Sequence, residues 1–180
     1  YDGTSWSSVN SGLTGRRSAA GGGTTTAALT FGGFVPPYTD LAEEYDGTSW
    51  TQVTVMNTAR GVLAGTHAGT VTAMLAIGGY GPPGATYFAN TEYYNGSTWS
   101  EVADMGTASN SMGAAGTSTA AIKAGGNIAT GNSNLTEEWT VPSTVTLAQE
   151  GQVWYNTTST VLKGFALNLP LGAWASGNNL

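Results

Sequence analysis

The stretch Tyr45-Asp-Gly-Thr-Ser-Trp50 decides the fold of this chain, because the sequence repeats it. It stands unchanged at residues 1–6 and returns with small changes as Tyr94-Asn-Gly-Ser-Thr-Trp99. Asp-Gly and Asn-Gly readily adopt the positive φ angles of a tight hairpin turn. The aromatic residues on either side then lie on two paired strands, so each copy predicts the tip of a β-hairpin.

Three apolar runs that end in a double glycine form the second repeated signal. They are Ala27–Gly33, Ala73–Gly79 and Ala120–Gly126, and their first glycines lie 46 and 47 residues apart. The third run precedes a variant motif, Glu137-Glu-Trp139, in which the tryptophan aligns with the tyrosine of the other repeats. A period in the forties with four short strands per unit indicates β-propeller blades.

Val, Thr, Tyr and Trp favour strands, whereas Gly and Pro interrupt them, and this alternation defines the strands of each repeat. In the first repeat we expect strands at 17–21, 25–32, 40–45 and around Trp50. In the second we expect strands at 60–66, 71–78, 90–94 and around Trp99. In the third we expect strands at 111–116, 119–125 and 135–139. Loops at 34–39 and 80–84 follow the double glycines, and residues 1–13 hold the last strands of a repeat whose first half is missing.

The composition excludes several classes of protein. Charged residues make up only 9% of the chain, well below the roughly 25% of typical soluble proteins. No apolar run approaches the roughly 20 residues that span a bilayer, so we expect no membrane insertion. The net charge of −6 argues against nucleic acid as a partner, because such binding requires clustered Lys and Arg. The absence of cysteine excludes disulfides, thiolate metal sites and cysteine nucleophiles.

His67 is the only histidine, and it lies at an expected strand-to-strand turn. A zinc centre or a Ser-His-Asp triad would need partners that converge on it. The corresponding turns of the other repeats carry no histidine, which favours an exposed turn residue. Asp2, Asp46 and Asn95 are turn formers without the spacing of a calcium loop. We therefore predict no catalytic residue, no cofactor and no metal ion, and we interpret the chain as non-enzymatic.

Charged side chains recur by repeat position. Glutamates precede the third-strand aromatic residue in every repeat, at Glu43, Glu44, Glu92, Glu137 and Glu138. A glycosidase needs two carboxylates on one bond, whereas these are spread over several repeats, so we expect them to bond neighbouring backbone or hydroxyl groups. Three arginines stand at the starts of first strands, namely Arg16, Arg17 and Arg60. We expect them to pair with the glutamates; contact with an acidic or sugar ligand is the alternative.

The order of double glycine, tyrosine and tryptophan within one period resembles the kelch repeat, over residues 1–139. The resemblance implies an all-β, kelch-like β-propeller of about three four-stranded blades around a central channel, with partial strands at the N-terminus. It also implies that the double glycine closes the second strand where backbones crowd, and that Tyr and Trp pack between strands. These structural roles fall on Gly32, Gly33, Tyr45, Trp50, Gly78, Gly79, Tyr94, Trp99, Gly125, Gly126 and Trp139.

The sequence changes after Trp139, and we divide the chain accordingly. Residues 1–140 are the propeller blades, 141–150 a linker or exit strand, and 151–167 a C-terminal β-hairpin. Residues 168–180 are a candidate start of a further repeat, because Trp174 precedes Leu180 by six residues, as Trp50 precedes Met56. A plain C-terminal strand is the alternative. Propellers close with about 4–8 blades, so we expect unseen sequence or further copies of the chain to supply the missing ones.

Variable aromatic residues gather in the loops after the double glycines, and we take them as candidate ligand contacts. They are Phe34, Tyr38, Tyr80, Tyr87 and Phe88. Exposed tyrosines on a rigid scaffold suit the recognition of sugars or protein surfaces. The alternative is that these rings cap the edges of the blades.

Low charge, near-identical Asp-Gly-Thr-Ser-Trp repeats and the Gly-Gln-Val-Trp-Tyr-Asn segment at 151–156 resemble the long repeat proteins of tailed, especially marine, bacteriophages. The resemblance implies a structural or tail-fibre protein of the virion, outside any cell, with other virion proteins as partners. Its propeller would be a spacer, or an adhesin for host-surface glycan or protein. The alternatives are a cellular kelch-type interaction module and a glycan-active propeller enzyme.

Overall fold

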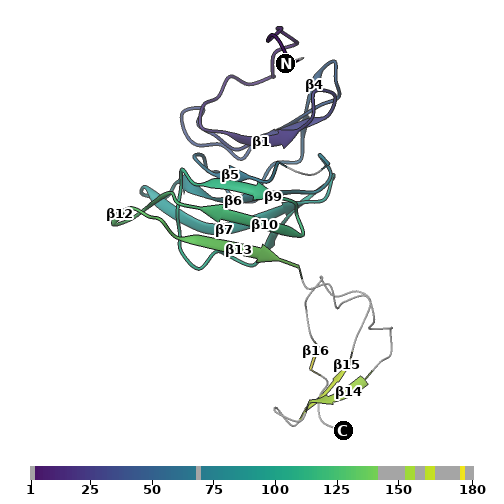
Figure 1. Cartoon of the computed structure of the whole chain (residues 1–180), viewed down its shortest axis with the longest axis vertical. Helices are drawn as coiled ribbons and strands as arrows, with labels where there is room; N and C mark the ends of the chain where they lie inside the picture. The colour runs from purple at the N-terminus through teal and green to yellow at the C-terminus, as the bar shows by residue number, and fades with distance from the viewer. Residues whose placement is uncertain (1–2, 68–69, 142–152, 157–160, 165–174, 177–180) are drawn as a thin grey trace. The chain divides into compact units, whose positions relative to one another are not determined.

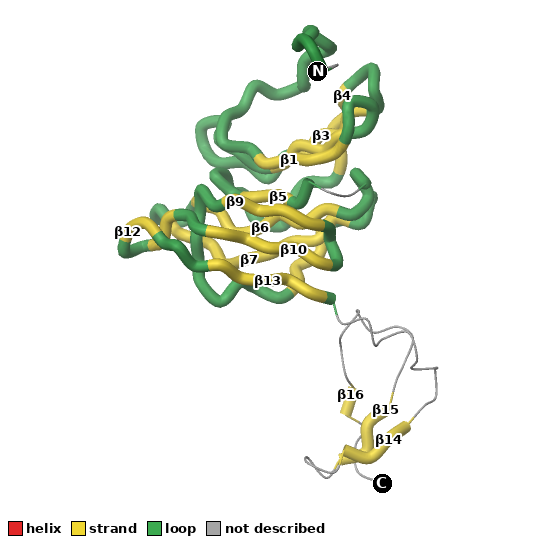
Figure 2. The backbone as a smooth tube through the Cα atoms, in the orientation of Figure 1, coloured by secondary structure: helices red, strands yellow, loops and turns green. Residues whose placement is uncertain are grey.

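The computed structural model describes residues 3–67, 70–141, 153–156, 161–164 and 175–176. Within these ranges the fold is all-β, with antiparallel sheets and no helix (Figures 1 and 2). The described residues accordingly hold no helix of the length and apolarity that a membrane crossing requires. The chain divides into two compact units, Tyr1–Thr140 and Val141–Leu180.

Two four-stranded antiparallel sheets follow one another along the first unit. The first sheet has the order β1-β2-β3-β4, with strands at Ala20–Gly23, Ala28–Phe31, Ala42–Tyr45 and Trp50–Val53. The second sheet has the order β5-β6-β7-β8, with strands at Ala64–Gly65, Met74–Gly81, Thr86–Tyr94 and Trp99–Val102. Each sheet is a plain meander, so the hairpin motifs join third and fourth strands as the sequence predicts, with Tyr45 opposite Trp50 and Tyr94 opposite Trp99.

The third sheet has three strands within the described residues. Their order is β13-β10-β9, with bounds Gly113–Gly116 for β9, Ala120–Ala124 for β10 and Thr136–Thr140 for β13. A short hairpin, β11 at Asn127–Ile128 and β12 at Gly131–Asn132, lies between β10 and β13 in the chain. The fourth strand that the repeat predicts does not occur among the residues the structure describes.

The second unit contains a separate small sheet. Strand β14 at Val153–Asn156 pairs with β15 at Val161–Gly164, and β15 also pairs with β16 at Ala175–Ser176. The predicted linker at 141–150 lies outside the described residues apart from residue 141. Whether 168–180 begins a further repeat stays a prediction.

Two apolar clusters lie where consecutive sheets meet. The first strands run side by side, β1 next to β5 and β5 next to β9. Strand β6 contributes to both clusters, because successive side chains of a strand point to opposite faces of the sheet. Met74 and Ala76 pack with Leu29 and Phe31 of the first sheet, whereas the residues that alternate with them belong to the second cluster. That second cluster contains Leu75, Ile77, Met112 and Ala121. The second sheet therefore buries both of its faces, and the first and third sheets each bury one face against it.

A line of backbone hydrogen bonds also joins the three sheets. Val62 donates its N–H to the carbonyl of Ser18 at 2.8 Å, and Ser111 donates to the carbonyl of Val62 at 2.9 Å. All three residues have positive φ, at 59°, 55° and 53° in chain order. A β-branched residue rarely adopts this conformation, so the surrounding contacts fix Val62 in place.

The predicted strand bounds need correction at three places. The first strand of each sheet begins later than expected. Residues 17–19 and 60–63 make contacts between sheets and do not form a continuous ladder with the second strand. The expected loop at 80–84 is mostly hairpin: β6 runs to Gly81 and β7 starts at Thr86, since Tyr80 pairs with Tyr87. The described part of residues 1–13 forms no strand, because it makes isolated contacts and not a paired ladder.

Gly78 lies where the second sheet closely approaches the segment that leads into the third sheet. It has a φ of +55°, and a Cβ there would lie 2.5 Å from the carbonyl oxygen of Ser109 in the next connecting segment. That oxygen already accepts a hydrogen bond from the N–H of Gly79 at 2.9 Å, so it cannot move away freely. Gly84 also has a positive φ, +70°, but a Cβ at that position would meet no atom within 4 Å.

We predict that Gly78→Ala lowers the free energy of unfolding by about 3 kcal/mol or more, because it adds a backbone clash to the conformational cost. Gly84→Ala is the matched control and should lose only about 1 kcal/mol, the conformational cost alone. Urea unfolding of both variants measures the difference. Equal losses would show that crowding at Gly78 is not what fixes the glycine.

Candidate functional site

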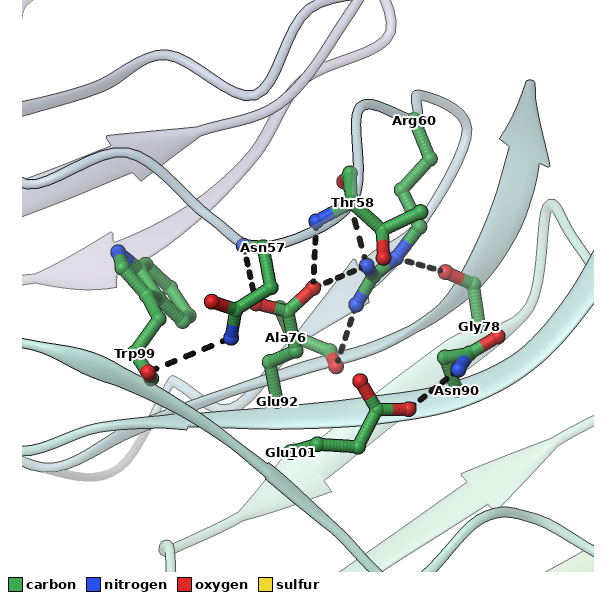
Figure 3. A network of polar contacts seen from close by, with 9 residues as sticks. All are labelled: Asn57, Thr58, Arg60, Ala76, Gly78, Asn90, Glu92, Trp99 and Glu101. Carbon is green, nitrogen blue, oxygen red and sulfur yellow. Dashed lines mark hydrogen bonds and ion pairs between the residues drawn. The ribbon is translucent and has the colours of Figure 1, made fainter. Parts of the chain in front are cut away.

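A buried ion pair occupies the second sheet, and Figure 3 shows its surroundings. The guanidinium of Arg60 and the carboxylate of Glu92 contact each other directly, and both side chains are fully buried. Arg60 also donates to the carbonyl of Gly78 at 2.9 Å and to that of Ala76 at 3.4 Å. Glu92 accepts from the backbone N–H of Asn57 at 2.7 Å. The pair thus ties the segment that connects the first and second sheets to β6 and β7.

The first sheet has the same arrangement. Arg16 pairs with Glu43, with side-chain exposures of 6% and 2%. Arg16 donates to the carbonyls of Gly32 and Leu41, at 3.3 and 2.9 Å. Glu43 accepts from the backbone N–H of Leu13 at 2.9 Å. The sequence expectation that arginines pair with the recurring glutamates is therefore correct for Arg16 and Arg60.

In the third sheet the cation comes from a strand and not from the connecting segment. The position that corresponds to Arg60 is Ser109, whose carbonyl bonds to Gly79 as the carbonyl of Arg60 bonds to Gly33. Lys123 on β10 takes over, with its Nζ 3.1 Å from Glu137. Glu137 still accepts from the connecting segment, through the N–H of Gly106 at 2.6 Å. The carboxylate is thus constant over the three sheets, whereas its partner changes.

We predict that Glu92→Gln lowers the free energy of unfolding by about 3 kcal/mol or more, because it leaves the buried guanidinium of Arg60 without a counter-charge. Glu101→Gln on the neighbouring strand is the control. That exposed carboxylate bonds only to Asn90 in Figure 3, so its loss should cost less than about 1 kcal/mol. Chemical denaturation of both variants tests this. A small loss in Glu92→Gln would mean that the pair contributes little.

The titration of Glu137 reports on the third pair. Burial alone would raise the pKa of this carboxyl, but the hydrogen bond from Gly106 and the charge of Lys123 together hold the pKa below its usual value. A lowered pKa in the folded state gives stability that is present above the unfolded pKa and is lost as the pH falls through the folded one.

We predict that Lys123→Met raises the pKa of Glu137 and removes the part of this acid sensitivity that depends on the ion pair. Carboxyl chemical shifts followed by NMR from about pH 7 to about pH 2 measure it, a range that spans the ordinary carboxyl pKa. Lys163→Met, at the only other lysine, is the control and should leave the pKa of Glu137 unchanged. An unchanged pKa in Lys123→Met would contradict the assigned pairing.

The hairpin turns are closed by their own side chains. Asp46 accepts from the N–H groups of Thr48 and Ser49 at 2.8 and 2.7 Å. These bonds lower the pKa of the Asp46 carboxyl. Asn95 accepts in the same way from Ser97 and Thr98, at 2.9 Å each. Both side chains close their own turns, as expected for Asp-Gly and Asn-Gly.

A row of half-buried rings forms the best candidate for a binding site. These rings belong to Phe34, Tyr38, Tyr80 and Tyr87, and together with the exposed Arg17 we call them the aromatic strip. The ring centroids of Phe34 and Tyr38 are 4.9 Å apart, those of Tyr38 and Tyr80 5.9 Å, and those of Tyr80 and Tyr87 5.2 Å. Each contact is edge-to-face, the geometry that aromatic quadrupoles favour. The strip crosses from the first sheet to the second.

Arg17 ends the strip with a cation over an aromatic face. Its guanidinium carbon lies 4.3 Å from the ring centroid of Phe34. The sequence expectation for Arg17 is wrong in this respect, because it packs on a ring and not on a glutamate. This contact follows from the backbone pairing of Arg17 with Phe34, and the sequence gives no sign of that pairing.

Four of the five candidate ligand contacts thus lie together in the strip. The fifth, Phe88, lies on β7 opposite Gly79 and has no ring contact of this kind among the described residues. His67 is an exposed residue after β5, as expected. In the described part of the chain no group of three or more His, Asp or Glu side chains could hold a metal ion.

The comparisons with known proteins support the fold alone. No family model and no curated protein matches the sequence. The solved structure of YjhT is similar, with a TM-score of 0.62 and 17% sequence identity. The match covers 74% of this chain and 45% of YjhT, so this chain spans less than half of that protein.

Proposed function

We propose that residues 1–140 are blades of an incomplete kelch-like β-propeller, and that the chain is a non-enzymatic structural or fibre protein of a bacteriophage virion. In this role the propeller is a spacer, or an adhesin that binds a glycan or protein of the host surface. The observation that carries the binding role is the aromatic strip.

The repetition of sheets supports the propeller part of the proposal. Two four-stranded meanders and a three-stranded sheet follow each other, with their first strands adjacent and an apolar cluster at each junction. Blades of a propeller bury their faces only against neighbouring blades. Three blades are fewer than the about 4–8 that close a ring, so further copies or other segments would complete it.

The chemistry of the aromatic strip supports the adhesin part. Its tyrosines are half-buried, so packing fixes one side of each ring while the rest faces solvent. Such rings offer apolar surface and a hydroxyl group at little cost in conformational entropy, which suits recognition of sugars and protein surfaces. The exposed Pro36, Pro37, Pro82 and Pro83 flank the strip on the two loops.

We predict that Tyr38→Ala combined with Tyr80→Ala weakens binding to a host surface at least tenfold, because the two central rings of the strip are lost. Binding of the full chain to an array of bacterial surface polysaccharides, and to intact host cells, measures this. His67→Ala is the control, since His67 is exposed on a turn outside the strip. Binding that survives the double substitution would place the adhesive surface elsewhere.

The location in a virion needs a separate experiment. Mass spectrometry of purified phage particles, followed by cryo-electron microscopy of the appendages, should find the chain and its rings of sheets there. Absence of the chain from purified particles would favour the cellular interaction module instead.

A further inference from the structure

The charge of Arg17 sets it apart from the other cations of the first unit. Four arginine and lysine side chains lie in this unit, and the structure describes all of them. Arg16, Arg60 and Lys123 each pair with a glutamate, and their side chains are no more than 6% exposed. Arg17 is exposed and forms no ion pair with any described residue. Its positive charge is therefore available to a ligand.

The guanidinium of Arg17 is held in place although it is exposed. The backbone N–H of Phe34 donates to the carbonyl of Arg17 at 2.7 Å, and the N–H of Arg17 donates back to Phe34 at 3.3 Å. The ring of Phe34 then supports the guanidinium from one side, with 4.3 Å between the ring centroid and the guanidinium carbon. A guanidinium offers five N–H donors in a planar fork. In Arg17 these donors meet no acceptor among the described residues, so the fork is positioned before any ligand binds.

The tyrosines of the aromatic strip provide a second kind of contact beside this fork. Tyr38, Tyr80 and Tyr87 are half-buried, and each packs edge-to-face on a neighbouring ring. Their hydroxyl groups bond to no other described residue. A sugar ring has an apolar face of C–H groups and a rim of hydroxyl groups. Rings with apolar surface and an unused hydroxyl match both features of a sugar.

The size of the aromatic strip favours a narrow ligand over a folded protein. An aromatic side chain has about 150–250 Å² of surface, and the four rings of the strip are half-buried. Together with Arg17 they expose well under the about 800 Å² that each partner contributes to a standard protein interface. A polysaccharide is a narrow chain, so it can follow a single row of rings.

The charge of the whole protein limits the kind of anion that the strip can bind. Arg17 supplies one positive charge, whereas the chain has a net charge of −6. A phosphomonoester carries about −1.5 to −2 and would bring more charge than Arg17 neutralises. A carboxylate carries one charge, and its two oxygens fit the guanidinium fork. Repulsion from distant carboxylates of the protein is screened beyond about 8 Å at physiological ionic strength.

We propose that the aromatic strip binds an acidic polysaccharide, a sugar chain whose repeat unit carries one carboxylate. The carboxylate pairs with the fork of Arg17, and the following sugar units pack on Tyr38 and Tyr80. Arg17 thus determines the preference for charge, whereas the tyrosines contribute to the binding of any sugar chain. This inference rests on the adhesin role proposed above and adds the class of ligand.

Paired polymers test the role of the carboxylate. Polygalacturonate, alginate and hyaluronate are each immobilised beside their carboxyl-reduced forms, which have the same backbone without the charge. We expect the full chain to bind at least one acid form about tenfold or more tighter than its reduced form, since charge-assisted bidentate hydrogen bonds are the strong ones. Biosensor measurements at physiological ionic strength give the two affinities.

Substitutions of Arg17 test whether this residue is responsible. Arg17→Gln should remove the preference and bind both forms with the affinity of the reduced one. Arg17→Lys keeps the charge without the fork and should restore only part of the preference. Lys163→Gln is the matched control, because it removes the same charge from the second unit, and it should keep the full preference. Arg17→Gln should also unfold at the same urea concentration as the original chain, because the side chain is exposed.

The inference is overturned if no acid form is preferred over its reduced form, or if Arg17→Gln keeps the preference. It is also overturned if protease treatment of host cells abolishes binding, because the partner is then a protein. None of these results removes the adhesin role. That role fails separately, when binding to host cells survives the combined Tyr38→Ala and Tyr80→Ala substitutions.

Discussion

A carboxylate on the third strand of each sheet, buried in the first two sheets and half-buried in the third, is the constraint on which the first unit depends. Glu43, Glu92 and Glu137 each accept a hydrogen bond from the backbone of the segment that enters their own sheet. A buried charge must be neutralised, because an uncompensated one costs several kcal/mol. The cation that does so also bonds to carbonyls in or next to the strands of the first two sheets, so one electrostatic requirement fixes the path of the segment that enters each of these sheets.

The apolar contacts are arranged around this polar centre. Strand β6 sends alternate side chains to the two junctions, and the Tyr94–Trp99 pair packs against Phe31 of the preceding sheet. Burial of Tyr94, together with the nearby charge and hydrogen bond of Glu44, raises the pKa of its phenol to about 12. The ring therefore stays neutral at physiological pH inside a junction that already contains a buried ion pair.

Much of this could be predicted from local sequence, because the signals are local. Asp46-Gly and Asn95-Gly specify their turns through bonds within four residues, and the alternation on β6 follows from the pleat. What could not be predicted depends on contacts between repeats. The sequence places Arg16 and Arg17 side by side, yet one is buried on Glu43 and the other lies over Phe34. Similarly, the third sheet has a serine at position 109, where an arginine is expected, and its cation is at Lys123. No periodic pattern in the sequence connects these two positions.

The move of the cation from Arg60 to Lys123 has a consequence for how such repeats can be exchanged. The hairpin motifs are nearly identical in sequence, so an exchange of repeats at a turn would keep each glutamate with its own cation. A crossover between the connecting segment and the second strand would be different. It would join Ser109 to a strand with alanine at position 76, which leaves the carboxylate with no cation, or join Arg60 to Lys123, which gives it two. Crossovers that separate a glutamate from its own counter-ion should therefore destabilise the resulting sheet.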